Sequence, residues 1–294
     1  METRRIISEI ENGNYDNLFL DIYVDEDKIS YQKQRYVNAI ESYIEEFGED
    51  DVEIYSAPGR SEVGGNHTDH QHGEILAASI NLDAIGIVKK TDDMKVSILS
   101  KGYTLTTISL ENLDMQEEEK ETTIALIKGV VAGLANRGYK IGGFKAYITS
   151  DVLIGAGLSS SAAYETLIGN IVSGLYNNMS VSAEEIAIIG QFAENVYFGK
   201  PCGLMDQMAC SIGNMVHVDF ADINNPKVEK VTFDLNKYGY SLCITDTKGS
   251  HADLTADYAA VPEEMKKVAA FFGKEVLLGL TVDDILENIV KVRE

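Results

Sequence analysis

A run of small residues at 155–163, GAGLSSSAA, stands between an expected strand and an expected helix. Small residues let the backbone approach a ligand closely, and backbone amides at the start of a helix favour an anion such as phosphate. The serine hydroxyls can donate hydrogen bonds or act as oxygen ligands for Mg2+. The run therefore predicts a phosphate-binding loop, although a tight turn capped by serines is the alternative on composition alone.

Two common phosphate-binding patterns do not fit this run. A Walker sequence would continue with Gly-Lys, which does not follow here. The dinucleotide-binding fingerprint would have its third glycine where Ser160 stands. The loop therefore belongs to another class of phosphate site.

The segment 57–73, APGRSEVGGNHTDHQHG, gathers three of the five histidines and several other polar side chains. One interpretation is a zinc or other divalent metal site formed by His67, Asp69, His70 and His72. The spacing argues against it, because alternate residues of an extended loop point in opposite directions and no His-x-x-x-His helical pair is present. A second interpretation is a site for a hydroxyl-rich ligand such as a sugar, which needs several donors and acceptors in fixed places. A solvated loop is the third.

A single acid, Asp206, follows the glycine of the sequence PCGLMDQ at the expected start of a short helix. Capping of that helix is the plain interpretation of an aspartate in this place. The chemical interpretation is a carboxylate that orients or deprotonates a hydroxyl group. Arg60 would suit it as a neighbour, because a guanidinium favours an ionised carboxylate and can stabilise a phosphoryl group in transfer.

The apolar pattern predicts the elements that position these residues. Val37, Ile40, Tyr43 and Ile44 recur at helical spacing before Gly48, which is a typical helix end. Short β-branched runs between 52 and 100 predict a sheet. The residues after that predict alternating elements: a helix over 121–137, a strand over 144–149 and a helix from 161.

The later part of the chain predicts further helices and strands. Ser182 and Glu185 have the spacing of a capping box before a helix that should run to about Gly199. The sequences MVHVDF and YSLCIT predict strands. Apolar spacing predicts two more helices, over 261–272 and 281–292.

Composition narrows the class of partner. The chain has 294 residues and a net charge of -22, which repels nucleic acid and anionic lipid surfaces but does not exclude a nucleotide at a local positive site. The amino terminus lacks a signal-peptide core, and no apolar stretch is long enough to span a membrane. Three unpaired cysteines favour a reducing compartment. We expect a cytoplasmic monomer that binds small molecules.

The loop GAGLSSSAA resembles the phosphate-binding motif of the galactokinase, homoserine, mevalonate and phosphomevalonate (GHMP) kinases. The family often has proline where Leu153 or Ile154 stands. The resemblance implies ATP and Mg2+ as cofactors, with Ser161 as a metal ligand. It also implies these ATP-binding residues: Gly155, Gly157, Leu158, Ser159, Ser160 and Ser161.

The histidine-rich segment resembles the galactokinase signature, in which APGR opens a sugar-binding loop. By position, Arg60 is the signature arginine, which is implied to be catalytic, and Asn66, His67 and Asp69 are the implied sugar ligands. Asn66 stands where galactokinases usually have glutamate, and His70 where they usually have tyrosine. These two exchanges leave the identity of the sugar open.

Two later segments extend the resemblance. FAENVYFGKPCGLMDQMACSIG resembles the galactokinase stretch whose aspartate lies beside the anomeric hydroxyl of the sugar, which implies that Asp206 is catalytic and that Gly203 contacts the sugar through its backbone. The segment 246–258 resembles a later stretch whose tyrosine binds the sugar, and by position this is Tyr258. A core or surface tyrosine is the alternative there.

The resemblance implies an α+β, two-domain GHMP kinase fold with the active site between the domains. The expected domains are a lead-in at 1–50, a sugar- and ATP-binding domain at 51–214, and an incomplete second domain at 215–294, since no glycine-rich third motif follows Gly213. The implied reaction is ATP-dependent phosphorylation of the anomeric hydroxyl of galactose. The alternatives are a kinase for a related sugar and a non-catalytic sugar sensor.

Overall fold

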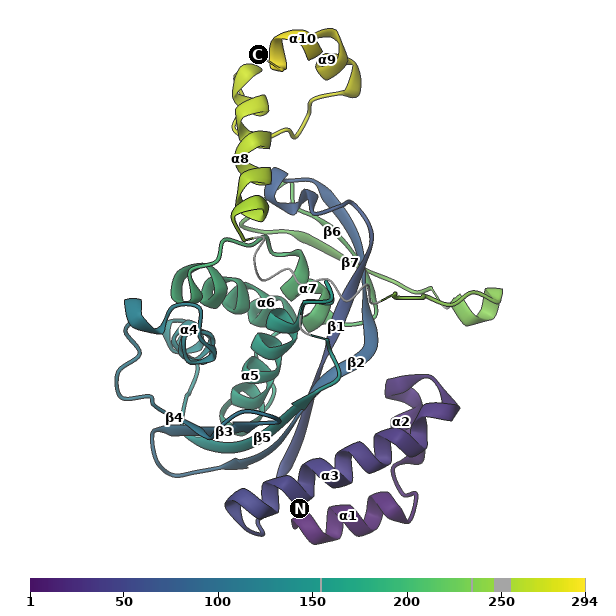
Figure 1. Cartoon of the computed structure of the whole chain (residues 1–294), viewed down its shortest axis with the longest axis vertical. Helices are drawn as coiled ribbons and strands as arrows, with labels where there is room; N and C mark the ends of the chain where they lie inside the picture. The colour runs from purple at the N-terminus through teal and green to yellow at the C-terminus, as the bar shows by residue number, and fades with distance from the viewer. Residues whose placement is uncertain (154, 234, 246–254, 294) are drawn as a thin grey trace.

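A computed structural model describes residues 1–153, 155–233, 235–245 and 255–293 of the chain. Within these residues seven strands form one sheet (Figure 1). They are β1 (Glu53–Gly64), β2 (Glu74–Lys90), β3 (Lys95–Ser100), β4 (Thr106–Ser109), β5 (Phe144–Ser150), β6 (Met215–Asp219) and β7 (Lys227–Val231).

The long strand β2 organises the sheet. On one edge it pairs antiparallel with β1 along most of its length. On the other edge, residues 84–90 pair with β5 and residues 74–78 pair with β6, both antiparallel. The residues between these two ladders, 79–83, face neither strand, so a gap opens in the sheet at this point. The strands β3 and β4 continue the sheet beyond β5, and β7 continues it beyond β6.

Helices cover both faces of the sheet (Figure 1). The N-terminal helices α1 (Thr3–Glu11), α2 (Asp16–Tyr23) and α3 (Ile29–Phe47) lie on one face. On the other face lie α4 (Thr123–Asn136), α5 (Ser160–Asn177), α6 (Ala183–Phe192), the π-helix η4 (Ala193–Phe198) and α7 (Met205–Ile212). Short 3-10 helices are η1 (Glu26–Lys28), η2 (Thr68–Gln71), η3 (Glu117–Glu119) and η5 (Leu235–Tyr238).

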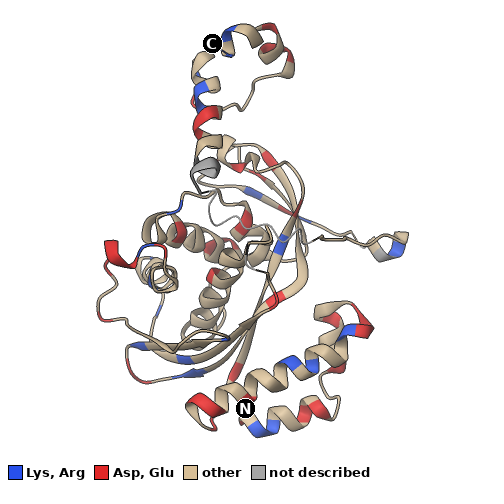
Figure 2. Cartoon of the chain, in the orientation of Figure 1, with Lys and Arg blue, Asp and Glu red and all other residues tan. Residues whose placement is uncertain are grey.

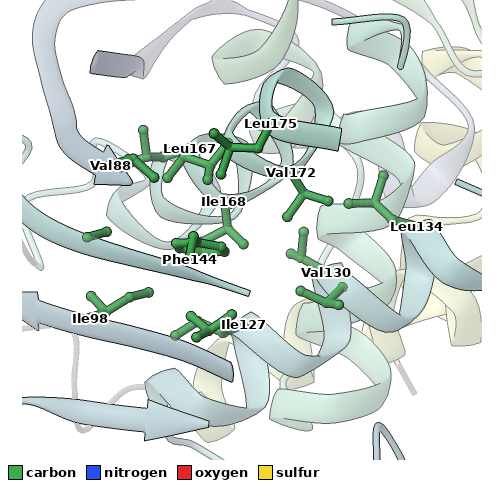
Figure 3. Packing of buried hydrophobic residues seen from close by; sticks show 14 of the residues in the cluster. Val88, Ile98, Ile127, Val130, Leu134, Phe144, Leu167, Ile168, Val172 and Leu175 are labelled. Atoms are coloured by element: carbon green, nitrogen blue, oxygen red, sulfur yellow. The ribbon is translucent and has the colours of Figure 1, made fainter. Parts of the chain in front are cut away.

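The alternation of side chains along the strands explains these two layers. Ile85 and Ile87 of β2 are fully buried against the N-terminal helices, whereas Ala84 and Val88 point to the opposite face and join the core under α4 and α5. Figure 3 shows that second core, where Val88 and other strand residues meet apolar side chains of α4 and α5. A strand buried on both faces needs a nearly continuous apolar sequence, and residues 84–88 of β2, AIGIV, have one.

The C-terminal helices extend away from the sheet (Figure 1). They are α8 (Thr255–Phe271), α9 (Val282–Glu287) and α10 (Ile289–Val292). Two contacts join this part to η2: His70 Nε2 lies 3.2 Å from Met265 Sδ, and the backbone N–H of Leu277 donates to Gln71 Oε1 at 3.0 Å. The start of α8 follows residues that the structure does not describe.

Most expected elements are confirmed. The helix that was expected to stop at Gly48 is α3, and the Ser182–Glu185 capping box is present at the start of α6. The helix expected to reach Gly199 does so, but its last six residues form the π-helix η4. The expected helix over 281–292 is interrupted at Asn288, so that it forms α9 and α10.

The strand predicted for YSLCIT, residues 240–245, is wrong. These residues form no regular structure and their side chains are exposed, including Leu242 at 48% and Ile244 at 43%. A strand requires a neighbour for its backbone hydrogen bonds, and β7 does not pair with this segment in the described part of the chain.

The pairing of β6 also bears on the expected domain boundary. Both β6 and β7 lie after residue 214, yet they continue the sheet to which β2 belongs.

No helix of the described residues combines the length and the apolar character that crossing a membrane would require.

Candidate active site

The glycine-serine loop follows β5 and ends where α5 begins. Its backbone turns through left-handed conformations at Gly155 (φ 75°), Gly157 (φ 72°) and Ser159 (φ 57°). A Cβ atom added to either glycine would meet nothing within 4 Å, so the glycines are required by the backbone conformation rather than by crowding. The same open space leaves the loop accessible to a ligand.

The loop lies beside the gap in the sheet. Leu158 of the loop and Val152, which precedes it, form a buried apolar cluster together with Ile80 and Leu82 of β2. Leu158 is only 4% exposed, so a contact between this residue and ATP would have to come from its backbone. The carbonyl of Leu158 already accepts a hydrogen bond from the backbone N–H of Arg60 at 3.1 Å.

Arg60, Ser159 and Asp206 meet at this loop, although they are far apart in the sequence. Arg60 Nε donates to Asp206 Oδ1 at 2.8 Å, and Arg60 Nη2 lies 2.7 Å from the same oxygen. The hydroxyl of Ser159 donates to Asp206 Oδ2 at 2.6 Å. A third guanidinium nitrogen, Nη1, donates to the carbonyl of Gly157 at 2.8 Å. The predicted contact between Arg60 and Asp206 is therefore present, and Ser159 completes it.

Asp206 does not cap its helix, which was the plain interpretation of this residue. It is the second residue of α7, Leu204 precedes the helix, and no side chain caps this end. Both carboxylate oxygens are instead engaged by the arginine and the serine. The side chain is 28% exposed, so it remains within reach of a bound molecule.

A second polar cluster lies next to this one, and the sequence analysis did not find it. It is built around Glu194 of η4, which is 3% exposed. Glu194 Oε1 accepts a hydrogen bond from the Ser161 hydroxyl at 3.2 Å and lies 3.3 Å from Lys200 Nζ. The signal was available, because Glu194 is the single charged residue in the mostly apolar helical stretch IAIIGQFAENVYF.

The other oxygen of Glu194 faces the buried amide of Gln207. Gln207 Nε2 donates to Glu194 Oε2 at 2.9 Å and to Glu165 Oε2 at 3.1 Å, so that one amide bridges two carboxyl groups. Burial and the nearby charge of Glu194 raise the pKa of Glu165 well above its ordinary value of 4.5. We therefore expect Glu165 to be protonated and Glu194 to carry the negative charge of the pair.

Ser161 and Glu194 are the pair that could hold a divalent cation. A hydroxyl and a carboxylate are hard oxygen ligands that Mg2+ prefers; Ser161 belongs to the loop predicted to bind phosphate, and Glu194 contacts it. No group of three or more histidines, cysteines or acids in the described residues is arranged to hold a metal. The histidine-rich segment forms no such group: the His67 ring lies 3.9 Å from Glu62, and the His70 ring contacts Met265.

The predicted sugar residues form the loop around η2. Asn66 and His67 are exposed and adopt left-handed backbone conformations, with φ of 46° and 55°. Asp69 is 2% exposed, and its Oδ2 accepts a hydrogen bond from the backbone N–H of Met205 at 2.9 Å. A Cβ atom on Gly203 would overlap the carboxylate of Asp69, so only glycine fits there.

The structure thus brings one part of the predicted site together. Arg60, Ser159 and Asp206 are in direct contact, and Asp69 joins the η2 loop to the residue that precedes Asp206. Asn66 and His67 are not in contact with this group. The side chain of Tyr258 lies outside the described residues.

Two protein-family models match segments of the chain that contain residues of the site. The family model "GHMP kinases N terminal domain" matches residues 125–214, which include the glycine-serine loop and Asp206. The family model "Galactokinase galactose-binding signature" matches residues 41–90, which include Arg60 and Asp69.

Curated relatives give the same result over most of the chain. The galactokinase of Clostridium tetani is 27% identical over 90% of this chain and 67% of its own length. The galactokinase of Streptomyces coelicolor is 29% identical over 83% of this chain and 63% of its own length. The galactokinase of Pyrococcus furiosus is 32% identical over 78% of this chain and 62% of its own length. The chain therefore spans about two thirds of the length of these relatives.

Solved structures support the fold assignment. The Lactococcus lactis galactokinase complexed with galactose superimposes with a TM-score of 0.72 at 25% identity, over 86% of this chain and 66% of that one. The Methanococcus jannaschii mevalonate kinase, at 17% identity, shares the fold with a TM-score of 0.55 over 83% of this chain and 80% of that one. Together with the matched family segments, these similarities show that this chain is a galactokinase-like member of the GHMP kinase superfamily and has its α+β fold.

Proposed function

We propose that the protein phosphorylates the anomeric hydroxyl of galactose with ATP. The observation that carries this proposal is the arrangement around Asp206, whose two carboxylate oxygens are held by Arg60 from β1 and Ser159 from the glycine-serine loop. A carboxylate fixed beside a phosphate loop is placed to orient a sugar hydroxyl toward a transferring phosphoryl group.

Each residue of this group has a distinct part in the proposed reaction. Asp206 orients the hydroxyl and accepts its proton as the new bond to phosphorus forms. Arg60 neutralises charge on Asp206 and on the phosphoryl group, while its hydrogen bond to the carbonyl of Gly157 fixes the loop. Because phosphoryl transfer depends mostly on position and charge, loss of either side chain should lower kcat more than it raises KM.

Ser161 and Glu194 would hold Mg2+, since they supply two hard oxygen ligands next to the loop. The cation would neutralise charge on the β and γ phosphates of the nucleotide. Two other parts of the site support this arrangement. Gln207 donates a hydrogen bond to Glu194, and the backbone amides of the loop would bind the phosphates.

The sugar assignment rests on the η2 loop and on its likeness to the galactose-binding signature. His67 and Asn66 are exposed and can offer an imidazole and an amide to sugar hydroxyl groups. Asn66 replaces the usual glutamate, so a neutral amide stands in place of a charged acceptor. A related sugar is therefore the second candidate, and the test includes it.

The test measures ATP turnover by this chain with a panel of sugars: galactose, glucose, N-acetylgalactosamine and galacturonate. Asp206→Asn serves as the inactive variant, and Asp222→Asn, a change at an exposed turn residue, serves as the matched control. We expect turnover that depends on galactose, that is lost in Asp206→Asn, and that is unchanged in Asp222→Asn. Preference for another sugar of the panel would reassign the substrate. Tight sugar binding without turnover would favour the sensor function instead.

A further inference from the structure

We propose that Lys200 binds the terminal phosphoryl group of the nucleotide and that Glu194 holds the lysine in place for this purpose. The inference rests on the proposed function, because it assigns a nucleotide to the glycine-serine loop. Lys200 lies in the sequence FGKPCG, between η4 and α7, and the family resemblance gives it no role.

The backbone of Lys200 is fixed by the π-helix. The carbonyl of Glu194 accepts hydrogen bonds from the N–H groups of both Gly199 and Lys200, at 3.0 and 3.1 Å. Two more bonds, between the Asn195 side chain and the backbone of Cys202, fasten the next turn of the chain at 2.7 and 3.3 Å. Single π-turns within helices occur frequently at functional sites, where they displace the backbone for a particular side chain. Here the π-turn brings Lys200 back beside Glu194.

The side chain of Lys200 is linked to the glycine-serine loop through Glu194. Its ammonium group lies 3.3 Å from Glu194 Oε1, and the same oxygen accepts the hydroxyl of Ser161 at 3.2 Å. One carboxylate oxygen therefore joins Lys200 to the first turn of α5. The carboxylate of Glu194 is 4% exposed, whereas the lysine side chain is 44% exposed. The ion pair is thus oriented with its anion inside and its cation at the open side.

The ammonium group of Lys200 has N–H donors to spare for a ligand. An ammonium group has three N–H donors, and among the described residues Lys200 Nζ has one partner, Glu194. Arg60, the other cation of the site, is 8% exposed and directs its nitrogens at Asp206 and Gly157. Lys200 is therefore the cation that retains donors for the oxygens of a ligand.

The surroundings make such a cation necessary. The chain has a net charge of -22, and Figure 2 shows acidic residues in the N-terminal helices, the body of the fold and the C-terminal helices. Within the site itself, Asp206 and Glu194 are both negative. A polyphosphate bound here needs positive charge at its terminal end.

The experiment measures nucleotide binding by calorimetry, so it does not depend on turnover. The ligands are the nonhydrolysable analogue AMP-PNP and AMP, each with and without Mg2+. The variants are Lys200→Met and Lys200→Arg. Lys89→Met is the matched control, because Lys89 is also partly exposed, at 32%, and is paired with Asp50. Circular dichroism confirms that each variant is folded.

We expect Lys200→Met to weaken AMP-PNP binding by about tenfold to a hundredfold, the usual effect of losing a charged hydrogen bond. AMP binding should be unchanged, because AMP lacks the terminal phosphates. Lys200→Arg should bind AMP-PNP within about threefold of the wild type, since it keeps the charge. Equal losses for AMP-PNP and AMP, or no loss for either, would overturn the inference.

A double variant separates phosphate binding from simple neutralisation of Glu194. If Lys200 only neutralises the buried carboxylate, then Glu194→Gln combined with Lys200→Met should restore AMP-PNP affinity in the absence of Mg2+. We expect no restoration. A wild-type chain that binds AMP-PNP but phosphorylates no sugar would contradict the proposed function alone. A wild-type chain that does not bind AMP-PNP would contradict both.

Discussion

The carboxylate of Asp69 accepts a hydrogen bond from the backbone N–H of Met205 at 2.9 Å, and this bond joins the η2 loop to the first turn of α7. Asp206 is the next residue, so the position of the predicted catalytic carboxylate depends on the loop that carries the predicted sugar ligands. Asp69 has a supporting role in this arrangement, because its other oxygen accepts the backbone N–H of His70 at 3.0 Å.

Removal of this support should affect stability as well as turnover. We expect Asp69→Ala to lower the free energy of unfolding by about 1–3 kcal/mol, because the buried N–H of Met205 loses its partner. Urea unfolding measures this loss, with Asp222→Ala as the exposed control. A variant of wild-type stability with only a raised KM for the sugar would instead mean that Asp69 acts directly on the sugar.

The close approach of Gly203 to Asp69 gives a second prediction. Gly203→Ala would place a methyl group against the carboxylate, so we expect a loss of about 1–3 kcal/mol in unfolding free energy and a strongly reduced kcat. Gly64→Ala is the matched control, since a Cβ there meets nothing within 4 Å and should change neither quantity. Thermal unfolding together with steady-state kinetics measures both. Unchanged kinetics in Gly203→Ala would exclude this packing as a determinant of the site.

A buried ion pair connects the N-terminal helices to the sheet. Arg35 of α3 donates to Asp83 of β2 at 2.6 Å, and both side chains are less than a tenth exposed. Arg35→Met should lower the unfolding free energy by about 3–5 kcal/mol, because it leaves the charge of Asp83 buried without its partner. The exposed pair of Arg4 and Glu49 is the control, and Arg4→Met should cost less than about 1 kcal/mol. Similar losses in the two variants would contradict this ranking.

The raised pKa of Glu165 predicts a pH dependence of stability. Between the ordinary pKa of 4.5 and the raised pKa of the folded state, the unfolded chain loses the proton of Glu165 while the folded chain keeps it. The free energy of unfolding therefore falls as pH rises through this range, by about 1.4 kcal/mol per pH unit for Glu165. Glu165→Gln removes the effect, so the unfolding free energy of the variant should exceed that of the wild type by an amount that grows from pH 4.5 upward. Urea unfolding at several pH values tests this, and parallel curves for the two proteins would refute it.

Local patterns were sufficient to predict most of the elements. The apolar spacing before Gly48 predicted α3, and the box of Ser182 and Glu185 predicted the start of α6, because both depend on residues within a few turns of each other. The contact of Arg60 with Asp206 also followed from the type of chemistry, since a carboxylate beside a phosphate needs a cation.

Other features depend on contacts between distant segments. The pairing of Ser161 with Glu194 requires α5 and η4 to pack in one particular way, and no spacing in the sequence records it. The segment at 240–245 has the composition of a strand, but composition does not supply a neighbouring strand. The split of the β2 edge between β5 and β6 was hidden for the same reason.

The order of the elements along the chain also limits the order in which that split edge can be filled during synthesis. The strands β1, β2 and β5 and the glycine-serine loop are all translated before α7 and β6. Asp206 is added 146 residues after Arg60, so the nascent chain holds an arginine without its acidic partner for much of elongation. Residues 74–78 of β2 keep a free edge until β6 has been translated, and the carboxylate of Asp206 on α7 reaches Arg60 and Ser159 only at that late stage.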